Sequence, residues 1–475
     1  MSNTFSNLSL SDWVNVFQEI SLPYQQFGSF LPEQVELFTE IYNVLNNPMK
    51  KVNIFTAPPA SGKTHVISLL ANFLISRGHK IAIVVPNNYL KNEFERSKLE
   101  VIDRLEITIL NLFEYLNSDE EFDFILIDEA HNIKSYLDLD INNVKNFEID
   151  SSTDLFSYLI QIYLYSEKDF CVKQLDYPSA RNLLELLEVY YPEDIEDIIK
   201  DPTQWLTFIY IWKESGQALI KWVKSESIGN FKLPKGILML FSATTLSDEE
   251  LEFYCGIPSK IITRVTEIKS QSKWRNNQRV YVSIKDEPLI NDKIEYLKSI
   301  LKCIDRRALI LCNNYRTSNK IYFNLCDDFD NIFLISPKAL DRYEIYGEYL
   351  TRKNGILLTS SSIFWEGITV PNLDLLIIFN VPFPRPQIMD ILKGRTFFIK
   401  EEIARRLEQS LGRIGRKKGE FGLGLTLFDI HSYGLDLPTI VCESKYIRLN
   451  TWDVLLLINE IYSTKTKSIE MLCSE

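Results

Sequence analysis

Two adjacent carboxylates, Asp128 and Glu129, stand at the end of an apolar run and have the chemistry needed for nucleotide hydrolysis. The run reads FDFILIDEAHN over residues 122–132. Hydrolysis of a nucleotide needs two acidic groups side by side, because one holds Mg²⁺ and the other orients or deprotonates the attacking water. A buried parallel strand is a nearly continuous apolar run, and its carboxyl end opens into a crevice. By itself this segment is equally consistent with a solvated turn after a strand.

A phosphate-binding loop stands upstream of these carboxylates. The strand-like run over residues 52–56 leads into APPASGKT at 57–64, and an apolar, helix-like stretch follows over 66–75. In such a loop the glycine lets the backbone approach phosphate, and the amino end of the helix supplies free N–H groups. Lys63 would neutralise the β- and γ-phosphates, and Thr64 would ligate Mg²⁺ together with Asp128. The nucleotide-binding residues that we expect in the loop are Ala60, Ser61, Gly62, Lys63 and Thr64.

Length and composition are typical of an intracellular enzyme with more than one domain. A chain of 475 residues exceeds what one hydrophobic core usually supports, so we expect two or three domains. The amino terminus lacks the features of a signal peptide, and no apolar stretch is long enough to span a bilayer. The seven cysteines are scattered without a CxxC pair, which favours reduced thiols and a cytoplasmic protein. The net charge of −12 argues against a general nucleic-acid coat protein, although one basic groove would suffice for binding.

Apolar runs that each end in polar residues recur along the chain and predict parallel β-strands. In the first half, helix-like segments separate these runs, which is βαβ patterning. The second half repeats the pattern after the polar stretch 267–277, the expected linker. We therefore expect an α/β fold of two tandem parallel-sheet domains, one at 1–132 with 233–266 and one at 278–475 that ends in a helix. The runs are 52–58, 80–88, 107–112, 122–130, 236–245, 279–284, 308–314, 332–336, 355–362, 373–381 and 422–429.

Residues 133–232 differ in character and interrupt the first domain. Four segments there carry apolar residues at helical spacing, so we expect a helical insertion. Its aromatic residues, such as Tyr158, Tyr163 and Tyr165, have the chemistry of base-stacking platforms. The alternative, which their spacing favours, is that they form a core between helices. The four segments are 151–165, 180–191, 192–201 and 203–225.

Two short segments after predicted strands could bind phosphate or respond to it. Residues 242–244, Ser-Ala-Thr, form a hydroxyl-bearing linker that could couple the nucleotide site to a neighbouring element. Residues 359–362 supply hydroxyl groups, and Gly367 in the following IFWEGI run permits close backbone approach. Hydroxyl and amide groups of this kind suit contact with a nucleic-acid backbone.

Two arginines, Arg413 and Arg416, stand three residues apart in QSLGRIGR at 409–416 and share one face of a predicted helix. Such a pair can reach across a domain cleft to a γ-phosphate, and an arginine finger is worth about 10³–10⁵ in rate. Hydrolysis would then depend on domain closure. The alternative is a solvated basic face that continues into Lys417 and Lys418.

In their order along the chain, these segments resemble the motifs of superfamily 2 helicases. APPASGKT, DEAHN, SATT, FWEGI and QSLGRIGR carry the resemblance, and DEAHN, FWEGI and NVPFPRP are most similar to the XPD/DinG branch of the DEAH type. The resemblance covers about residues 30–430. It implies two RecA-like domains with ATP in the cleft between them and a single nucleic-acid strand across their tops. The insertion occupies the place of the arch domain of that branch.

The resemblance also implies roles for single residues of this sequence. The positions that match nucleotide contacts outside the phosphate loop are Gln34, Glu366 and Gly367. The positions that match contacts to the nucleic-acid strand are Pro86, Asn87, Thr359 and Ser360. The expected catalytic residues are Asp128 and Glu129, with Gln409, Arg413 and Arg416 in the place of the γ-phosphate sensors.

The sequence departs from that branch at two points. Its members commonly carry four cysteines between the phosphate loop and DEAH, which hold an iron–sulfur cluster, whereas residues 65–127 contain no cysteine. We therefore predict no iron–sulfur cluster and no domain built around one, which puts processive unwinding in doubt. Thr369 stands where the branch usually has Asp after Glu-Gly-Ile, so the contact to the ribose is expected to differ.

Two functions from different classes are consistent with the sequence. The first is an ATP- and Mg²⁺-dependent translocase or helicase on single-stranded DNA, or alternatively RNA, for which the resemblance favours 5′ to 3′ movement. The second is a regulatory or remodelling ATPase of a multiprotein assembly, in repair or anti-phage defence, whose insertion binds a protein partner. The acidic charge and the aromatic insertion favour the second function, and the predicted strand contacts favour the first. Neither involves a membrane.

Overall fold

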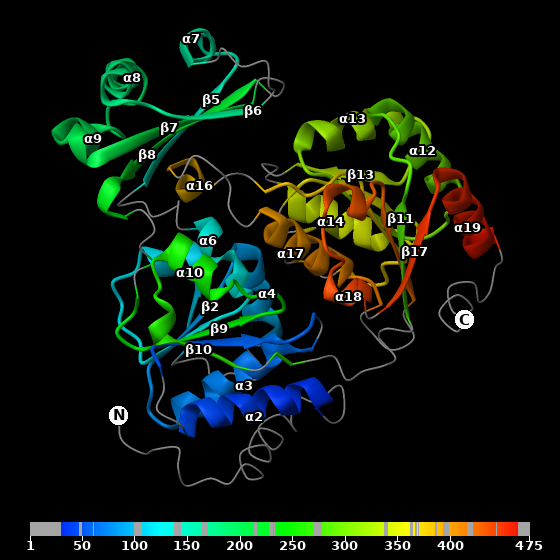
Figure 1. The fold of residues 1–475 in the computed structure, drawn as a ribbon, viewed down its shortest axis with the longest axis horizontal. Coiled ribbons are helices and arrows are strands. Elements are labelled where there is room, and N and C mark those ends of the chain that lie inside the picture. The colour runs from blue at the N-terminus through cyan, green and yellow to red at the C-terminus, as the bar shows by residue number, and fades with distance from the viewer. Residues whose placement is uncertain are drawn as a thin grey trace.

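The computed structural model contains two parallel sheets and a third, antiparallel sheet that belongs to the insertion (Figure 1). Both the carboxylates and the phosphate loop lie in the first parallel domain. The structure describes residues 30–463 apart from short gaps. Residues outside the description are 1–29, 47–49, 60, 99–106, 137–143, 164–169, 213–215, 228–230, 232, 266, 269–277, 337–340, 362–363, 366–367, 369, 385–386, 393–398, 416–420, 443 and 464–475. Most of the expected linker at 267–277 therefore falls outside it.

The first sheet has the strand order β10-β1-β9-β4-β2-β3, and its strands run parallel. Successive side chains of a strand point to opposite faces. Phe55 and Ile83 therefore pack against α2 and α3 on one face, while Ile54 and Val84 pack against α5 and α10 on the other. The strands are β1 (Val52–Thr56), β2 (Ile81–Val85), β3 (Ile107–Asn111), β4 (Phe124–Ile127), β9 (Ile237–Ser242) and β10 (Ile262–Arg264). The helices are α2 (Pro32–Asn46), α3 (Lys63–Ser76), α4 (Asn88–Lys98), α5 (Leu112–Leu116), η2 (Ala130–Asn132), α6 (Ile133–Tyr136), α10 (Asp248–Cys255) and η6 (Ser259–Ile261).

The second sheet has the order β13-β14-β12-β15-β16-β11-β17, again with parallel strands. Ile310 faces the core under α12, α13 and α19, and its neighbour Leu309 faces the core under α14 and α17. The strands are β11 (Arg279–Ile284), β12 (Ala308–Leu311), β13 (Ile332–Ile335), β14 (Ile356–Thr359), β15 (Leu375–Ile378), β16 (Gly422–Thr426) and β17 (Lys445–Leu449). The helices are α12 (Ile290–Lys302), α13 (Tyr315–Leu325), α14 (Arg342–Thr351), α16 (Ile388–Leu392), α17 (Ile399–Leu411), η7 (Ile430–Tyr433), α18 (Thr439–Cys442) and α19 (Thr451–Ser463).

The prediction of a helical insertion is wrong in part. The insertion contains an antiparallel sheet of order β5-β8-β7-β6, with helices on one face of the sheet. The segment 203–225 was expected to be a helix and instead forms β7 and β8 around a turn at Gly216. The reason is that both faces of β7 are covered: Phe208 and Ile209 are each buried although they point to opposite sides. The elements are β5 (Val144–Asp150), α7 (Asp154–Tyr163), β6 (Phe170–Gln174), α8 (Tyr177–Tyr190), α9 (Glu196–Lys200), η4 (Pro202–Gln204), β7 (Trp205–Trp212), β8 (Gln217–Lys224) and η5 (Ser225–Ser227).

The three remaining helical segments of the insertion form α7, α8 and α9, as predicted. Tyr158 is partly buried in the core between these helices and the sheet, in agreement with the core alternative. The side chain of Tyr163 and all of Tyr165 lie outside the description. Among the described helices, none combines the length and apolar character required to cross a membrane.

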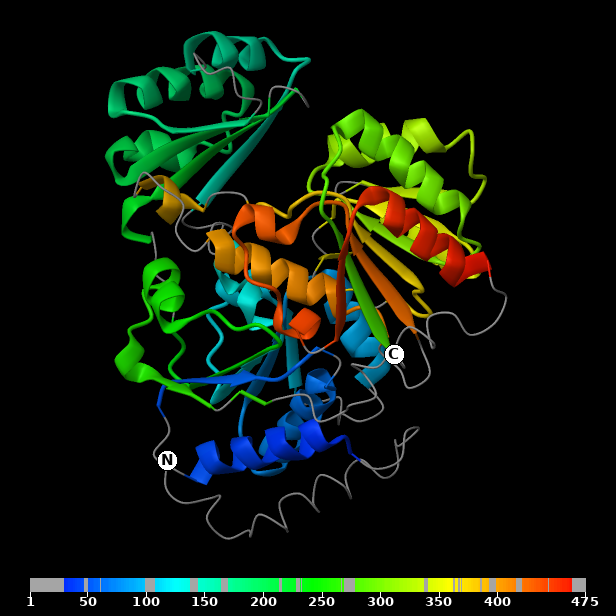
Figure 2. The same ribbon diagram turned by 45° about the vertical axis from the view of Figure 1, so that its right-hand side comes forward.

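The other face of the insertion sheet packs on α16, a short helix of the second parallel domain. Ile388 of α16 is buried among Phe208, Tyr210, Val144 and Val223 of the insertion strands. In two views α16 lies directly beside these strands (Figures 1 and 2). The insertion is therefore joined to the first domain through the chain and to the second domain through packing.

Candidate active site

The phosphate loop joins β1 to α3 and holds its glycine in a left-handed conformation. Gly62 has φ 80° and ψ 28° and directly precedes Lys63, the first residue of α3. A Cβ on Gly62 would meet Gln34 Nε2 at 2.4 Å, so the Gln34 side chain packs over the loop. Gln34 Oε1 accepts a hydrogen bond from Leu31 N at 2.9 Å, which fixes the orientation of the carboxamide. Both the backbone conformation and the available space therefore require glycine at this position.

The polar groups of the loop fit a bound phosphate. Lys63 is buried, and its Nζ donates to Ala57 O and Pro58 O, each at 3.1 Å. The Ser61 hydroxyl is buried and has no hydrogen-bond partner among the described residues. A phosphate at the amino end of α3 would accept hydrogen bonds from such groups and from the free N–H groups of the helix. Ala60, the remaining predicted loop contact, lies outside the description.

Asp128 follows β4 directly and meets the phosphate loop through Thr64. Thr64 Oγ1 donates to Asp128 Oδ2 at 2.7 Å, and Glu129 N donates to Asp128 Oδ1 at 3.0 Å. Burial and the neighbouring charge of Glu129 raise the pKa of Asp128 to about 6, against the opposing effects of Thr64 and Lys63. A hydroxyl and a carboxylate in contact are the oxygen ligands that Mg²⁺ takes, so Thr64 and Asp128 fit the predicted metal site.

Glu129 adopts a backbone conformation that is uncommon for residues other than glycine. Its φ and ψ are both 48°, and strained conformations of this kind cluster at active sites. Its Oε2 is buried and has no hydrogen-bond partner among the described residues. The contact of this oxygen with His131 Nδ1 is 3.5 Å long, too long for a strong hydrogen bond. One carboxylate oxygen can therefore accept a proton or hydrogen bond from a ligand.

A chain of hydrogen bonds leads from His131, two residues after this carboxylate, to the second domain. His131 Nδ1 lies 2.8 Å from Ser242 Oγ, and that hydroxyl accepts from Thr244 N at 3.2 Å. Thr244 Oγ1 in turn accepts from Gln409 Nε2 at 2.9 Å. The hydroxyl linker expected at 242–244 thus contacts His131, beside the candidate carboxylates, at one end and α17 of the second domain at the other.

The carboxyl end of α17 rests on the phosphate loop. A Cβ on Gly412 would lie 2.9 Å from Pro59 Cβ, so the backbone of the second domain touches the loop of the first. Arg413 is 3% exposed, which excludes the solvated-face alternative for this residue. It lies in the turn that follows α17, which ends at Leu411, and not on the predicted helix. Arg416 lies outside the description.

The predicted strand contacts of the first domain lie at the carboxyl end of β2. Pro86 is buried and Asn87 is half-buried. Asn87 Oδ1 accepts from Leu90 N at 3.0 Å and so caps α4. Its amide group is the part of the side chain that remains for a ligand.

Thr359 and Ser360 at the end of β14 differ in what they offer a ligand. Thr359 is fully buried, and its hydroxyl donates to Ile335 O at 3.1 Å and accepts from Ser361 N at 3.0 Å. This geometry favours a supporting role for Thr359 instead of the expected contact. Ser360 Oγ has no hydrogen-bond partner among the described residues and suits contact better. Glu366 and Gly367, the nucleotide contacts expected nearby, lie outside the description.

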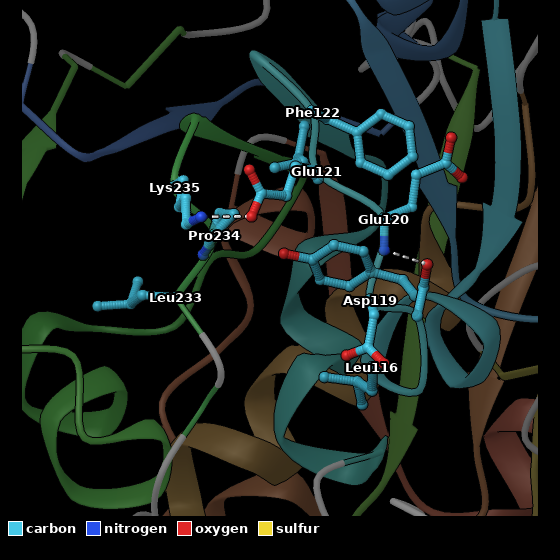
Figure 3. A pocket seen from close by; sticks show the side chains of 11 residues that line it. Leu116, Asp119, Glu120, Glu121, Phe122, Leu233, Pro234 and Lys235 are labelled. Carbon is cyan, nitrogen blue, oxygen red and sulfur yellow. Dashed lines mark hydrogen bonds and ion pairs between the residues drawn. The ribbon is translucent and has the colours of Figure 1, made fainter.

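A hollow of about 320 Å³ lies at the opposite edge of the first sheet, where β4 begins (Figure 3). Tyr115, Phe122 and Leu233 line it, and an ion pair joins Lys235 and Glu121 at its rim. None of the predicted site residues lines this hollow, so it is separate from the candidate nucleotide site. Within the described part of the chain, no group of three or more His, Cys, Asp or Glu side chains is arranged to hold a metal ion.

Comparisons with known proteins bear on the fold that carries this candidate site. The family model "Helicase C-terminal domain" matches residues 297–430. Dbp5 of S. cerevisiae, bound to RNA and ADP BeF3, is similar over 94% of this chain and 97% of its own, with 12% identity and a TM-score of 0.53. Mss116p without its NTE and C-tail, bound to ssRNA and AMP-PNP, is similar over 97% of this chain and 84% of its own, with 14% identity and a TM-score of 0.50. No curated protein sequence matches the chain.

The structural likeness, at such low identity, shows the fold. It confirms the predicted α/β architecture of two RecA-like domains. Together with the matched helicase C-terminal domain, it supports the broader part of the resemblance, a fold of the superfamily 2 helicase type.

Proposed function

We propose that this protein is an ATP-dependent translocase or helicase on single-stranded DNA, from the XPD/DinG-like branch of the DEAH type. One observation carries the proposal: the hydrogen-bond chain that joins His131, beside Glu129, to Gln409 of the second domain. A site built by two domains makes hydrolysis depend on their closure, and closure in turn moves the domains relative to each other.

The residues divide the work of hydrolysis among them. ATP with Mg²⁺ supplies the γ-phosphoryl group and the charge neutralisation that its transfer to water needs. Thr64 and Asp128 would hold the metal ion, and Lys63 would turn from its loop carbonyls to the phosphates. Glu129 would accept a proton from the attacking water. Arg413 would stabilise the charge that develops on the phosphoryl oxygens.

Hydrolysis would be coupled to movement through the contacts between α17 and the first domain. Loss of the γ-phosphate removes the partner of Arg413, which weakens the closed arrangement that Gln409 and Gly412 complete. Asn87 of the first domain and Ser360 of the second would contact the strand backbone, so their separation would change with each cycle. The family resemblance favours movement from 5′ to 3′.

The proposal is tested by ATP turnover at low salt with no nucleic acid, with single-stranded DNA and with single-stranded RNA. Low salt is used because contacts to phosphates weaken steeply as salt rises. We expect stimulation by DNA. Stimulation by RNA alone, the ligand bound in both similar structures, would assign the substrate to RNA. Turnover that neither strand changes would overturn the translocase function.

The alternative function, a regulatory ATPase within a protein assembly, is favoured by one surface of the insertion. Val189 and Tyr190 at the end of α8 are 77% and 48% exposed, and Tyr177 at its start is 48% exposed. Exposed apolar side chains of this size suit a protein partner. Under this alternative, neither DNA nor RNA would change the rate of ATP turnover. Replacement of Val189 and Tyr190 by serine would abolish binding to the protein partner without changing basal turnover.

A further inference from the structure

Four charged side chains are buried where α17 of the second domain meets α6 and α10 of the first. We call them the interdomain charge cluster: Lys134, Glu250, Glu402 and Arg405. Arg405 Nη2 donates to both carboxylate oxygens of Glu250, at 2.8 and 2.7 Å, and Nη1 donates to Glu402 Oε2 at 2.6 Å. Lys134 Nζ lies 2.6 Å from the same Glu402 oxygen. Two positive and two negative charges therefore compensate one another across the domain boundary.

The burial of these groups makes their pairing specific. Glu250 is 2% exposed, and Arg405 is 6% exposed. Removing charges from water is costly, and a buried pair repays that cost only when its geometry is good. If α17 moved by one turn, Glu250 would lose Arg405 and keep the longer 3.5 Å contact with Lys134 of its own domain. The cluster therefore favours one position of α17 along its axis (its register) over positions shifted by a turn. This preference holds whatever the cluster contributes to the free energy of unfolding.

That register positions the residues of the candidate active site. Arg405 and Gln409 stand four residues apart, so they project from the same face of α17, about 6 Å apart along its axis. Gly412 stands almost one turn further, where the helix touches Pro59 of the phosphate loop. With Arg405 held on Glu250, Gln409 donates to Thr244 of the first domain, and Arg413 is buried just beyond the end of the helix.

A second contact from α16 supports the same docking surface. Tyr254 of α10 donates from its hydroxyl to Asp390 Oδ1 at 3.0 Å, and Gln387 N donates to Asp390 Oδ2 at 2.9 Å. Both carboxylate oxygens are thus used in the described structure. Helix α10 is therefore contacted by α17 through Glu250 and by α16 through Tyr254.

We propose that Arg405 is a positioning residue for ATP hydrolysis: by binding Glu250 it sets the register in which Gln409 and Arg413 reach the nucleotide. The inference rests on the proposed function, because it assigns Arg405 to the same two-domain site. It implies that the first domain binds nucleotide without Arg405, since the phosphate loop and Thr64 belong to that domain.

The test compares Arg405→Met with a matched control on the same helix, Arg406→Met. Arg406 is partly exposed and contacts the other oxygen of Glu402, Oε1, at 3.2 Å, whereas the described arginine hydrogen bonds to Glu250 come from Arg405. We expect Arg405→Met to lower kcat by about 10- to 100-fold, the cost of small misplacement at a reacting centre, with the Kd of a fluorescent ATP analogue unchanged. Arg406→Met should keep most of its turnover. Equal kcat values for the two variants would overturn the proposal.

A double-mutant cycle on kcat distinguishes an effect on the register of α17 from a general loss of stability. Glu250→Gln and Arg405→Met act on the same contact, so the double variant should be no slower than the slower single variant. Losses that multiply would contradict the inference. Arg405→Lys keeps a charge but loses the planar guanidinium that gives one nitrogen to Glu250 and another to Glu402, and we expect it to fold normally with intermediate kcat. Wild-type turnover in this variant would contradict a requirement for the guanidinium geometry.

A distance measurement keeps this inference separate from the proposed function. Spin labels on the exposed positions Glu249 and Lys353 report the separation of the two domains without any turnover. The distance distribution should broaden in Arg405→Met and not in Arg406→Met. If wild-type protein has no ATPase activity, the proposed function fails while this distance result still stands; an unchanged distribution in Arg405→Met would refute the docking role itself.

Discussion

The two adjacent carboxylates are turned toward different partners, which suits two different roles. Asp128 Oδ2 accepts from Thr64 of the phosphate loop, whereas Glu129 Oε2 has no hydrogen-bond partner among the described residues. The left-handed backbone at Glu129 produces this separation, because it redirects the chain immediately after β4. Asp128 is thereby directed toward the expected metal and Glu129 toward the expected water.

Replacement of Glu129 by glutamine tests this division of roles. Glu129→Gln should bind ATP as well as wild type but lose turnover by about 10²–10⁴-fold, because a carboxamide cannot accept the proton of the attacking water. Turnover and nucleotide affinity are measured on the same preparation, with the wild-type protein as control. Turnover at the wild-type rate would remove Glu129 from the mechanism.

Local spacing predicted the strand, loop and helix that carry the candidate nucleotide residues, but it did not predict how these residues use their hydrogen bonds. The phosphate loop and Asp128 depend on a strand, a turn and a helix in sequence, and such short-range order is visible in the residues themselves. That Gln34 packs over Gly62, and that the Thr359 hydroxyl is used by Ile335, depends on elements distant in the chain. A sequence read without those neighbours has no signal for either contact.

At the scale of elements, strands buried on both faces explain what was predicted and what was missed. Each predicted parallel strand is present, because an apolar run between polar ends has few other interpretations in βαβ order. In the insertion, β7 and β8 are also apolar on both faces, and their runs were mistaken for helices. The edge strands β10 and β17 were not predicted, since they are short or only partly buried.

Helix α17 carries an acidic residue whose ionisation links docking to pH. Burial alone would raise the pKa of Glu402, but the charges of Lys134, Arg405 and Arg406 outweigh this effect and hold the pKa well below its usual range. A carboxylate with a depressed pKa stabilises the folded protein above its unfolded pKa of about 4.3. That stabilisation is lost as the pH falls through the folded pKa.

The free energy of unfolding should therefore differ between wild type and Glu402→Gln in a pH-dependent way. We expect the wild type to be the more stable protein from pH 8 down to about 5, and the difference to shrink below about pH 4, where the Glu402 carboxylate of the unfolded chain becomes protonated while that of the folded protein is still ionised. Denaturant unfolding at each pH measures the difference. A difference in the free energy of unfolding that stays constant down to pH 3 would show that Glu402 is not ionised in this cluster.

At the scale of the whole molecule, the insertion is positioned to sense movement of the second domain. It leaves the first domain after α6 and returns before β9, yet one face of its sheet packs on α16. Figure 2 shows α17 between the two parallel sheets and α16 below the insertion strands. Movement of the second domain relative to the first would therefore change the packing between α16 and the insertion strands.

Truncation of the α16 contact tests this coupling. Ile388 is 3% exposed among the insertion strands, so Ile388→Ala should weaken their packing by about 2–5 kcal/mol. Hydrogen exchange should become faster in β7 and β8 while the core of the first sheet stays protected. Val189→Ala, at a position 77% exposed, is the control and should leave exchange unchanged. Unchanged exchange in Ile388→Ala would show that the insertion does not depend on α16.

The contacts between the domains are the part that sequence alone could least predict. The interdomain charge cluster joins Lys134, Glu250, Glu402 and Arg405, which are separated by more than a hundred residues across the boundary. In sequence each of them resembles an ordinary charge on a solvated helix face. Only the packing of the two domains shows that these charges are buried and paired.

The most direct test of the account is the ATP turnover of Arg413→Ala in the presence of single-stranded DNA, since the central claim is a hydrolytic site completed by the second domain. We predict that turnover falls by about 10³–10⁵-fold relative to wild type, while nucleotide affinity, which belongs to the first domain, stays close to normal. Turnover of Arg413→Ala at the wild-type rate would contradict the claim.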